Sequence, residues 1–150
     1  MANLSNYAEN KVLDLLFKNT SFTAPQAFIA YFNNAITDAS VPTEVTGNGY
    51  ARIRIDNKMG SASSGSITNT SNITFNAASG GDHGTIVAIA IFDSLDSSGT
   101  NNMLAYGTLT ASKNIQDGDQ LQIATSNLTI TLDKYIGARP YGSYISILYP

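Results

Sequence analysis

Short runs of β-branched and aromatic residues, each closed by Gly, Asn, Asp or Ser, fill the chain from Phe22 onward. Runs of this length between turn-forming residues are typical of β-strands. The most apolar of them, residues 85–92, is hydrophobic on both faces, which predicts the most buried strand of the sheet system. About eight short strands with brief turns predict a mainly β fold, namely a β-sandwich or jelly-roll-like domain.

One helix precedes the strands. Ser5 can cap its first turn and Glu9 lies near that turn, while Ala8, Val12 and Leu15 recur at helical spacing. The fold predicted from the sequence is therefore a β-domain with one N-terminal helix.

The chain is expected to form a single domain over residues 1–150, because it contains neither an internal repeat nor a linker. Within it we predict a helix over residues 5–18 and a β-domain over residues 22–133. Residues 134–150 form an apolar C-terminal strand or extension in this division.

Two segments carry detailed strand patterns. Residues 28–32 follow Pro25 and predict a strand, although a short helix running on to Ile36 is a competing interpretation. Residues 50–56 alternate between apolar and charged side chains, which predicts a half-buried strand. The charged positions Arg52 and Arg54, together with Lys58, are expected on its solvated face.

The charge content excludes several classes of partner. Charged residues make up 13% of the chain, against roughly 25% in an average soluble domain. The net charge is −3 and no segment is strongly basic, so nucleic acid is not an expected partner. No apolar run approaches the roughly 20 residues of a membrane helix, and the first residues lack a signal-peptide pattern. The expected site of synthesis is a cytoplasm.

The sequence offers little for catalysis. His83 is the one histidine and could in principle join Asp82 or Asp93 and a serine, but no Gly-x-Ser-x-Gly motif accompanies it. We therefore expect His83 to be a structural residue of its loop. The chain also has no cysteine, which excludes disulfides and cysteine-based zinc sites.

Two carboxylate clusters are candidates for calcium binding, because Ca²⁺ prefers several hard oxygen ligands. Neither matches the twelve-residue calcium loop, and Asp favours turns for local reasons. We therefore predict turns, no metal, no cofactor and no enzymatic activity. The residues concerned are Asp93, Asp96, Ser97, Asp117 and Asp119.

Tyrosines are the remaining candidates for binding. Tyr50 and Tyr106 can line a sugar-binding groove or a protein interface, or can simply be strand residues in a sheet. Residues 135–150 are aromatic and almost uncharged, so this tail is expected either to complete its own sheet or to add to a neighbour's sheet edge. The predicted interface residues are Tyr135, Tyr141, Tyr144, Ile145, Ile147, Leu148 and Tyr149.

An ordered set of short motifs covers about residues 1–133 and resembles short virion proteins of tailed phages that are commonly labelled tail fibre proteins. The motifs are residues 1–7, 19–22, 28–32, 43–52, 67–70, 73–75, 84–87, 91–93, 104–109, 118–121 and 127–130. The sequence departs from the resemblance at His83, where a bulky aromatic residue is expected, and in the extension over residues 135–150.

The resemblance implies a non-enzymatic structural protein of the virion, made in the host cytoplasm. A compact chain of 150 residues without heptads or long repeats does not suggest a fibre shaft. The preferred expectation is therefore a capsid decoration, or cement, protein that binds the major capsid protein as a homo-oligomer, most simply a trimer. The alternative is a tail fibre or tail-tip adsorption module that contacts tail proteins and a glycan of the host surface.

Overall fold

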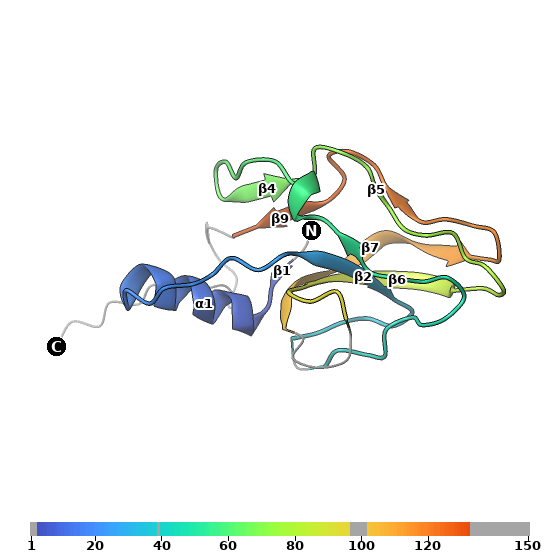
Figure 1. The fold of residues 1–150 in the computed structure, drawn as a ribbon, viewed down its shortest axis with the longest axis horizontal. Helices are drawn as coiled ribbons and strands as arrows, with labels where there is room; N and C mark the ends of the chain where they lie inside the picture. The colour runs from blue at the N-terminus through green and yellow to red at the C-terminus, as the bar shows by residue number, and fades with distance from the viewer. Residues whose placement is uncertain (1–2, 39, 97–101, 133–150) are drawn as a thin grey trace, which may run out of the picture.

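The structure, a computed structural model, describes residues 3–38, 40–96 and 102–132, and it is mainly β with one N-terminal α-helix, as predicted. Figure 1 shows the arrangement of these elements. They are β1 (Asn3–Leu4), α1 (Asn6–Phe17), β2 (Phe28–Phe32), β3 (Ile53–Arg54), the 3₁₀ helix η1 (Asp56–Lys58), β4 (Ser66–Thr68), β5 (Ile73–Thr74), β6 (Gly84–Phe92), β7 (Met103–Ile115), β8 (Gln122–Ile123) and β9 (Thr129–Thr131).

A five-stranded antiparallel sheet forms the larger layer, in the order β1-β7-β6-β2-β3. Its middle strand is β6, which pairs with β2 on one side and β7 on the other. The last five residues of β6 and all five of β2 are buried. Residues 88–92 are buried as expected, but Thr85 is exposed, and β2 is the strand that is buried along its whole length. The prediction that residues 85–92 form the most buried strand is therefore wrong, whereas residues 28–32 are a strand, as predicted, instead of a helix.

Alternate residues of these strands enter two hydrophobic clusters, one on each face of the sheet. On β2, Ile29 and Tyr31 pack into the larger cluster, while Ala30 and Phe32 pack into the smaller one. Ile36, from the segment after β2, lies in the smaller cluster. Side chains alternate along a strand, so a continuous apolar run requires cover on both faces. Here both faces are covered.

The second layer is a narrow antiparallel ribbon, in which β4 pairs with β9 and β5 pairs with β8. Figure 1 shows it lying over one face of the sheet. Phe75, Leu121 and Leu128 of the ribbon join Ile29 and Ile89 of the sheet in the larger cluster. The core therefore lies between two layers, which agrees with the predicted sandwich-like architecture.

The pairing inside the ribbon corrects an expectation. The sequence suggests one strand pair around Ile67 and Ile73, and a second over residues 120–124 and 128–132. Each of these strands instead pairs across the ribbon, with Ile67 opposite Ile130 and Ile73 opposite Ile123. Local turn signals cannot distinguish these pairings, because both use the same strands and differ only in which distant segments meet.

Asn69 fills the gap between the two halves of the ribbon. Its side-chain Nδ2 donates to the carbonyls of Ser71 and Ala124, both at 2.9 Å, and its Oδ1 accepts from the Leu128 amide at 2.9 Å. The residue is 1% exposed. A single amide side chain thus substitutes for ladder hydrogen bonds where the strands are interrupted.

The strand predicted over residues 50–56 is only partly present. Arg54 is exposed as expected, but Arg52 is buried, and β3 spans two residues before η1 begins. The expectation that Arg52 lies on a solvated face is wrong. Glu44 neutralises the Arg52 charge inside the protein, through an ion pair of 2.6 Å.

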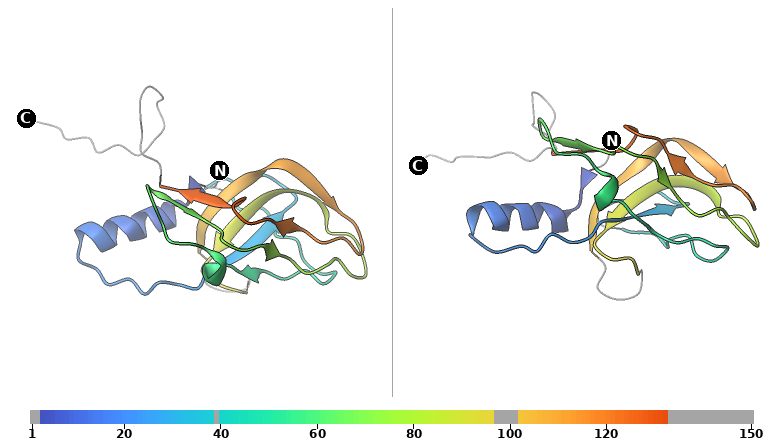
Figure 2. Two further views of the ribbon diagram at one scale, coloured as in Figure 1. Left: turned by 90° about the horizontal axis from the view of Figure 1, so that it is seen from above. Right: turned by 45° about the horizontal axis from the view of Figure 1, so that its top comes forward.

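Helix α1 lies apart from this two-layer body. Figures 1 and 2 show it projecting beyond the end of the strands in every view. None of its residues is fully buried. No helix among the described residues is long and apolar enough to cross a membrane.

Candidate functional site

Helix α1 is fixed to the body at its first turn. Ser5 is its N-cap, as predicted, and its Oγ accepts from the Ala8 amide at 3.2 Å. The same hydroxyl donates to the carbonyl of Met103, and the Ser5 amide donates to the carbonyl of Leu104 at 3.0 Å. The cap residue is buried, so these bonds join the start of the helix to β7.

Asp38 adds a second attachment at the same turn. Its carboxylate oxygens accept from the Asn6 amide at 3.0 and 3.2 Å. A carboxylate at a helix N-terminus is favoured by the helix dipole and by the unpaired amides there. Both attachments act on the first turn and leave the far end of the helix without comparable anchors among the described residues.

The far end of α1 exposes large apolar side chains. Leu16 is 65% exposed and Phe17 is 76% exposed, and both follow Leu13 at helical spacing. Leu15 and Phe22 are exposed as well. The only ion pair of the described helix is the exposed one between Lys18 and Asp14, at 3.4 Å. We call Leu13, Leu15, Leu16, Phe17 and Phe22 the apolar end of α1.

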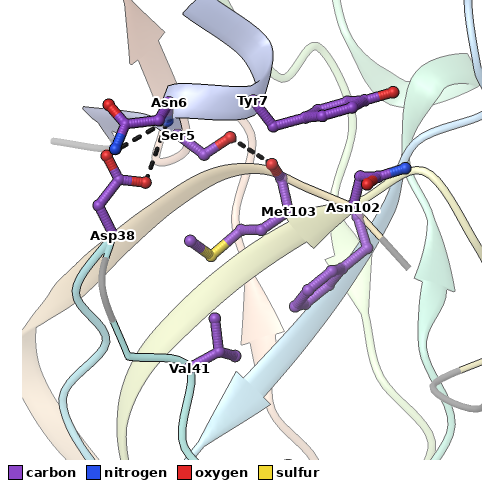
Figure 3. Close-up of a pocket in the computed structure, with 8 residues that line it drawn as sticks. Ser5, Asn6, Tyr7, Asp38, Val41, Asn102 and Met103 are labelled. Carbon is purple, nitrogen blue, oxygen red and sulfur yellow. Dashed lines mark hydrogen bonds between the residues drawn. The ribbon is translucent and has the colours of Figure 1, made fainter. Parts of the chain in front are cut away.

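A groove of about 300 Å³ lies at the opposite, anchored end of the helix, and Figure 3 shows its lining. Its size is at the lower limit of pockets that hold small molecules. Phe92, Met103 and Val41 provide apolar surface, while Asp38 and Asn102 provide polar groups. The Asn102 Nδ2 donates to Asp93 at 2.7 Å, which leaves its side-chain carbonyl oriented by that bond.

His83, the predicted loop histidine, has a structural role. It is buried, its Nδ1 is hydrogen bonded to the Tyr31 hydroxyl, and its Nε2 lies 2.9 Å from the carbonyl of Asn48. A carbonyl only accepts, so Nε2 is the donor, and in the neutral imidazole Nδ1 accepts from the Tyr31 hydroxyl. Burial raises the pKa of Tyr31 to about 12. The rings of Tyr31 and Tyr50 pack against the imidazole. His83 therefore fills with its own ring the position where the resemblance leads us to expect a bulky aromatic residue.

A tight turn presents the Asn48 carbonyl to His83. Gly47, Asn48 and Gly49 have φ values of 77°, 50° and 80°, a left-handed run that the Gly-Asn-Gly sequence makes accessible. A Cβ on Gly49 would approach the Ala77 carbonyl to 3.0 Å. The glycine is therefore required by both conformation and space.

A second buried network lies around Glu44. Arg52 Nε and Nη2 donate to its carboxylate at 3.0 and 2.6 Å, and the Tyr50 hydroxyl donates to it at 2.6 Å. Arg52 also lies 4.0 Å from the centre of the Phe92 ring. Burial, followed by the bond to Glu44, raises the pKa of Tyr50 well above its ordinary value. The network links residues 44–52 to the sheet and presents no free nucleophile.

Carboxylates of the two candidate calcium loops make hydrogen bonds to the backbone. Asp93 accepts from the Asn102 amide at 2.8 Å, Asp117 from the Gly80 amide at 2.9 Å, and Asp119 from the Gln116 amide at 3.0 Å. Asp96 lies in the segment after β6, and Ser97 lies outside the described residues. No group of three or more acidic or histidine side chains in residues 3–38, 40–96 and 102–132 is placed to hold a metal.

The tyrosine predictions divide in two. Tyr106 lies in β7 and packs against the smaller core cluster, whereas Tyr50 lies between the Gly47–Gly49 turn and β3 and packs against the larger one. Both are half-buried. The predicted interface residues of the tail all lie outside the described residues. They are Tyr135, Tyr141, Tyr144, Ile145, Ile147, Leu148 and Tyr149.

Sequence reasoning missed two features at α1. The helix pattern includes apolar positions, but nothing in it shows that the body fails to cover Leu16 and Phe17. Nothing in the sequence around Asp38 predicts its contact with Asn6 either, because β2 lies between the two residues in the chain. Both features depend on how distant segments meet.

Comparison with known proteins identifies the class as fibre proteins of short-tailed phages. The family model described as "Podophage GP4 fiber I protein gp80" matches residues 3–131. The match covers most of the chain, which therefore belongs to this family. No curated protein matches the sequence.

Membership of this family confirms the expected resemblance and makes the chain a phage structural protein of the fibre type. The preference for capsid decoration is not supported, because the matched family is a fibre family. The expectation of a capsid protein arose because a compact chain of 150 residues does not suggest a fibre shaft, which holds only if one subunit must span the fibre. A fibre can equally be built from many compact subunits that associate end to end or side by side.

Proposed function

We propose that the chain is a non-enzymatic building block of the tail fibre, which associates with further copies of itself through the apolar end of α1. One observation carries this proposal. Leu13, Leu16 and Phe17 expose a contiguous apolar surface on a helix that projects from the body. Exposed apolar patches of this kind are typical of protein–protein contacts.

Charge favours a second copy of the chain as the partner. Glu9 and Asp14 balance Lys11 and Lys18 along the helix, so identical helices meet without net repulsion. Few charges must be desolvated, because the apolar end itself carries none. We expect a closed homo-oligomer, with a trimer as the simplest case, that further binds tail proteins of the virion and neither nucleic acid nor membrane.

Sedimentation equilibrium of the full chain tests this assembly. The wild-type mass should exceed that of one 15.9 kDa chain, and the double variant Leu16→Gln/Phe17→Gln should shift the equilibrium toward monomer by at least about tenfold in dissociation constant. Leu95→Gln is the matched control, since Leu95 is 58% exposed but lies on the body. A monomeric wild type, or an equal effect of the control, would refute α1 as the contact.

A second proposed function is contact with a host-surface glycan, and the groove at the start of α1 favours it. Asp38 supplies acceptor oxygens, and the Asn102 amide is held in place by Asp93. Acceptors beside the apolar surfaces of Phe92 and Val41 suit a neutral ring that carries hydroxyl donors and an apolar face. A hexose is a ring of this kind.

Saturation-transfer NMR with glucose, galactose and N-acetylglucosamine tests the groove. At least one sugar should give signals that Asp38→Ala abolishes. Asp14→Ala, which removes a partly exposed carboxylate near the far end of α1, should leave these signals intact. Signals from no sugar, or signals that survive Asp38→Ala, would reject the groove as a sugar site. Neither result affects the self-association test.

A further inference from the structure

The outer edge of β7 has few partners for so long a strand. β1 pairs with it only at Ala105 and Tyr106. Beyond these positions, residues 107–114 have no strand on the side away from β6 among the described residues. Most of their side chains, from Thr108 onward, are exposed.

The inner edge of β7 is also partly unpaired. Thr108 pairs with Ala88 and Lys113 pairs with Ile86, so residues 109–112 of β7 stand opposite the single residue Val87. The ladder is therefore interrupted along the same stretch that lacks an outer neighbour. Unpaired strand edges present rows of amides and carbonyls and are templates for an added strand.

We propose that residues 144–149 of the same chain add to this edge of β7 as a further strand. The segment reads Tyr-Ile-Ser-Ile-Leu-Tyr, which is uncharged and consists mainly of residues that favour strands. Its alternate residues Ile145 and Ile147 would share one face. Leu109 of β7 already packs toward the larger core cluster, so an added strand would extend that apolar face.

The end of the described chain lies close enough for this addition. β9 contacts β1, and β1 pairs with β7 immediately before the free edge. Residues 133–143 connect Leu132 to the segment, and an extended chain at roughly 3.3 Å per residue reaches roughly 40 Å over that length. A tethered segment acts at an effective concentration of about millimolar, which favours the chain's own segment over that of a neighbour.

Hydrogen exchange of the β7 amides in the full chain tests the proposal. Outward-pointing amides of residues 108–114 should exchange at least about tenfold more slowly in the wild type than in Ile145→Pro/Ile147→Pro, because proline cannot donate to a ladder. Ala138→Pro, which changes the connecting residues alone, should retain the protection. Unchanged protection at residues 86–92 shows that the variant remains folded.

Three results would overturn the assignment. The outward amides could exchange at the rate of an unpaired edge in the wild type, or their protection could survive both prolines. Protection that disappears on hundredfold dilution would assign the added strand to a neighbouring copy instead of the same chain.

Discussion

The two-layer β body and helix α1 stabilise themselves in different ways. In the body, Tyr31, Phe75 and Ile73 are almost completely inaccessible to solvent, and every buried side-chain polar atom of the described residues has a hydrogen-bond partner. In α1 no residue is buried, and Phe17 is 76% exposed. The body satisfies its own apolar and polar groups, whereas the hydrogen-bonded anchors of the helix among the described residues lie at its first turn.

This contrast separates residues that serve folding from those through which we propose that the chain assembles. Burial of an aromatic side chain contributes several kcal/mol to a domain that is stable by only about 5–15 kcal/mol. The exposed leucines and phenylalanine of α1 contribute little to that balance while the chain is monomeric. The proposed self-association would bury them.

The largest expected difference separates two phenylalanines. Phe75→Ala should lower the free energy of unfolding by about 3–5 kcal/mol, because it leaves a cavity between the two layers. Phe17→Ala should change it by no more than about 0.5 kcal/mol in the monomer, since the side chain is already solvated. Urea unfolding at low protein concentration measures both, and similar losses would show that the body also depends on the apolar end of α1.

A smaller difference is expected between two asparagines of the ribbon. Asn69→Ala leaves the buried Leu128 amide and two carbonyls without their partner, so a loss of about 3 kcal/mol is expected. Asn72→Ala removes an exposed acceptor for the Thr125 amide, which water can replace, so its cost should stay below about 1 kcal/mol. Comparable melting temperatures for the two variants would contradict the role assigned to Asn69.

Removal of the cap should affect only the helix. Ser5→Ala deletes the acceptor for the Ala8 amide and the donor to Met103, and should weaken α1 by about 1–2 kcal/mol. Amide exchange of residues 8–17 should accelerate while that of β6 stays constant, and Ser21→Ala, beyond the helix, should change neither. Faster exchange throughout the body would show that α1 and the body unfold as one unit.

The smallest effect at neutral pH is expected from the buried tyrosines. Because burial raises the pKa of Tyr31 to about 12 from 10.0, its stabilisation is complete below pH 10 and is lost as the pH rises toward 12. Tyrosinate absorbance should therefore show exposed tyrosines ionising first, with Tyr31 and Tyr50 following together with unfolding. Tyr50→Phe should remove one late-titrating group, and a single transition near pH 10 for all tyrosines would contradict this burial.

The sequence predicted the parts of the fold that depend on local patterns. The helix with its Ser5 cap, the strand at residues 28–32 and the doubly buried run in β6 all follow from periodicity and capping. The sequence Gly47-Asn48-Gly49 likewise favours a turn, since its residues permit positive φ.

Features that depend on distant contacts were not predictable in the same way. Arg52 is buried because Glu44 lies beside it, and neither position shows this on its own. The ribbon pairs Ile67 with Ile130 across more than sixty residues, a choice that turn signals do not determine. The same holds for the candidate site, because the exposure of α1 and the position of Asp38 are set by where the body ends.

The most direct test of the proposed fibre role is quantitative mass spectrometry of purified virions separated into heads and tails. The fibre assignment predicts that the chain accompanies the tail fraction. It also predicts that the Leu16→Gln/Phe17→Gln variant is missing from virions, whereas the Leu95→Gln variant is present in them. Hundreds of copies in the head fraction and few in the tails would contradict the fibre role and favour capsid decoration.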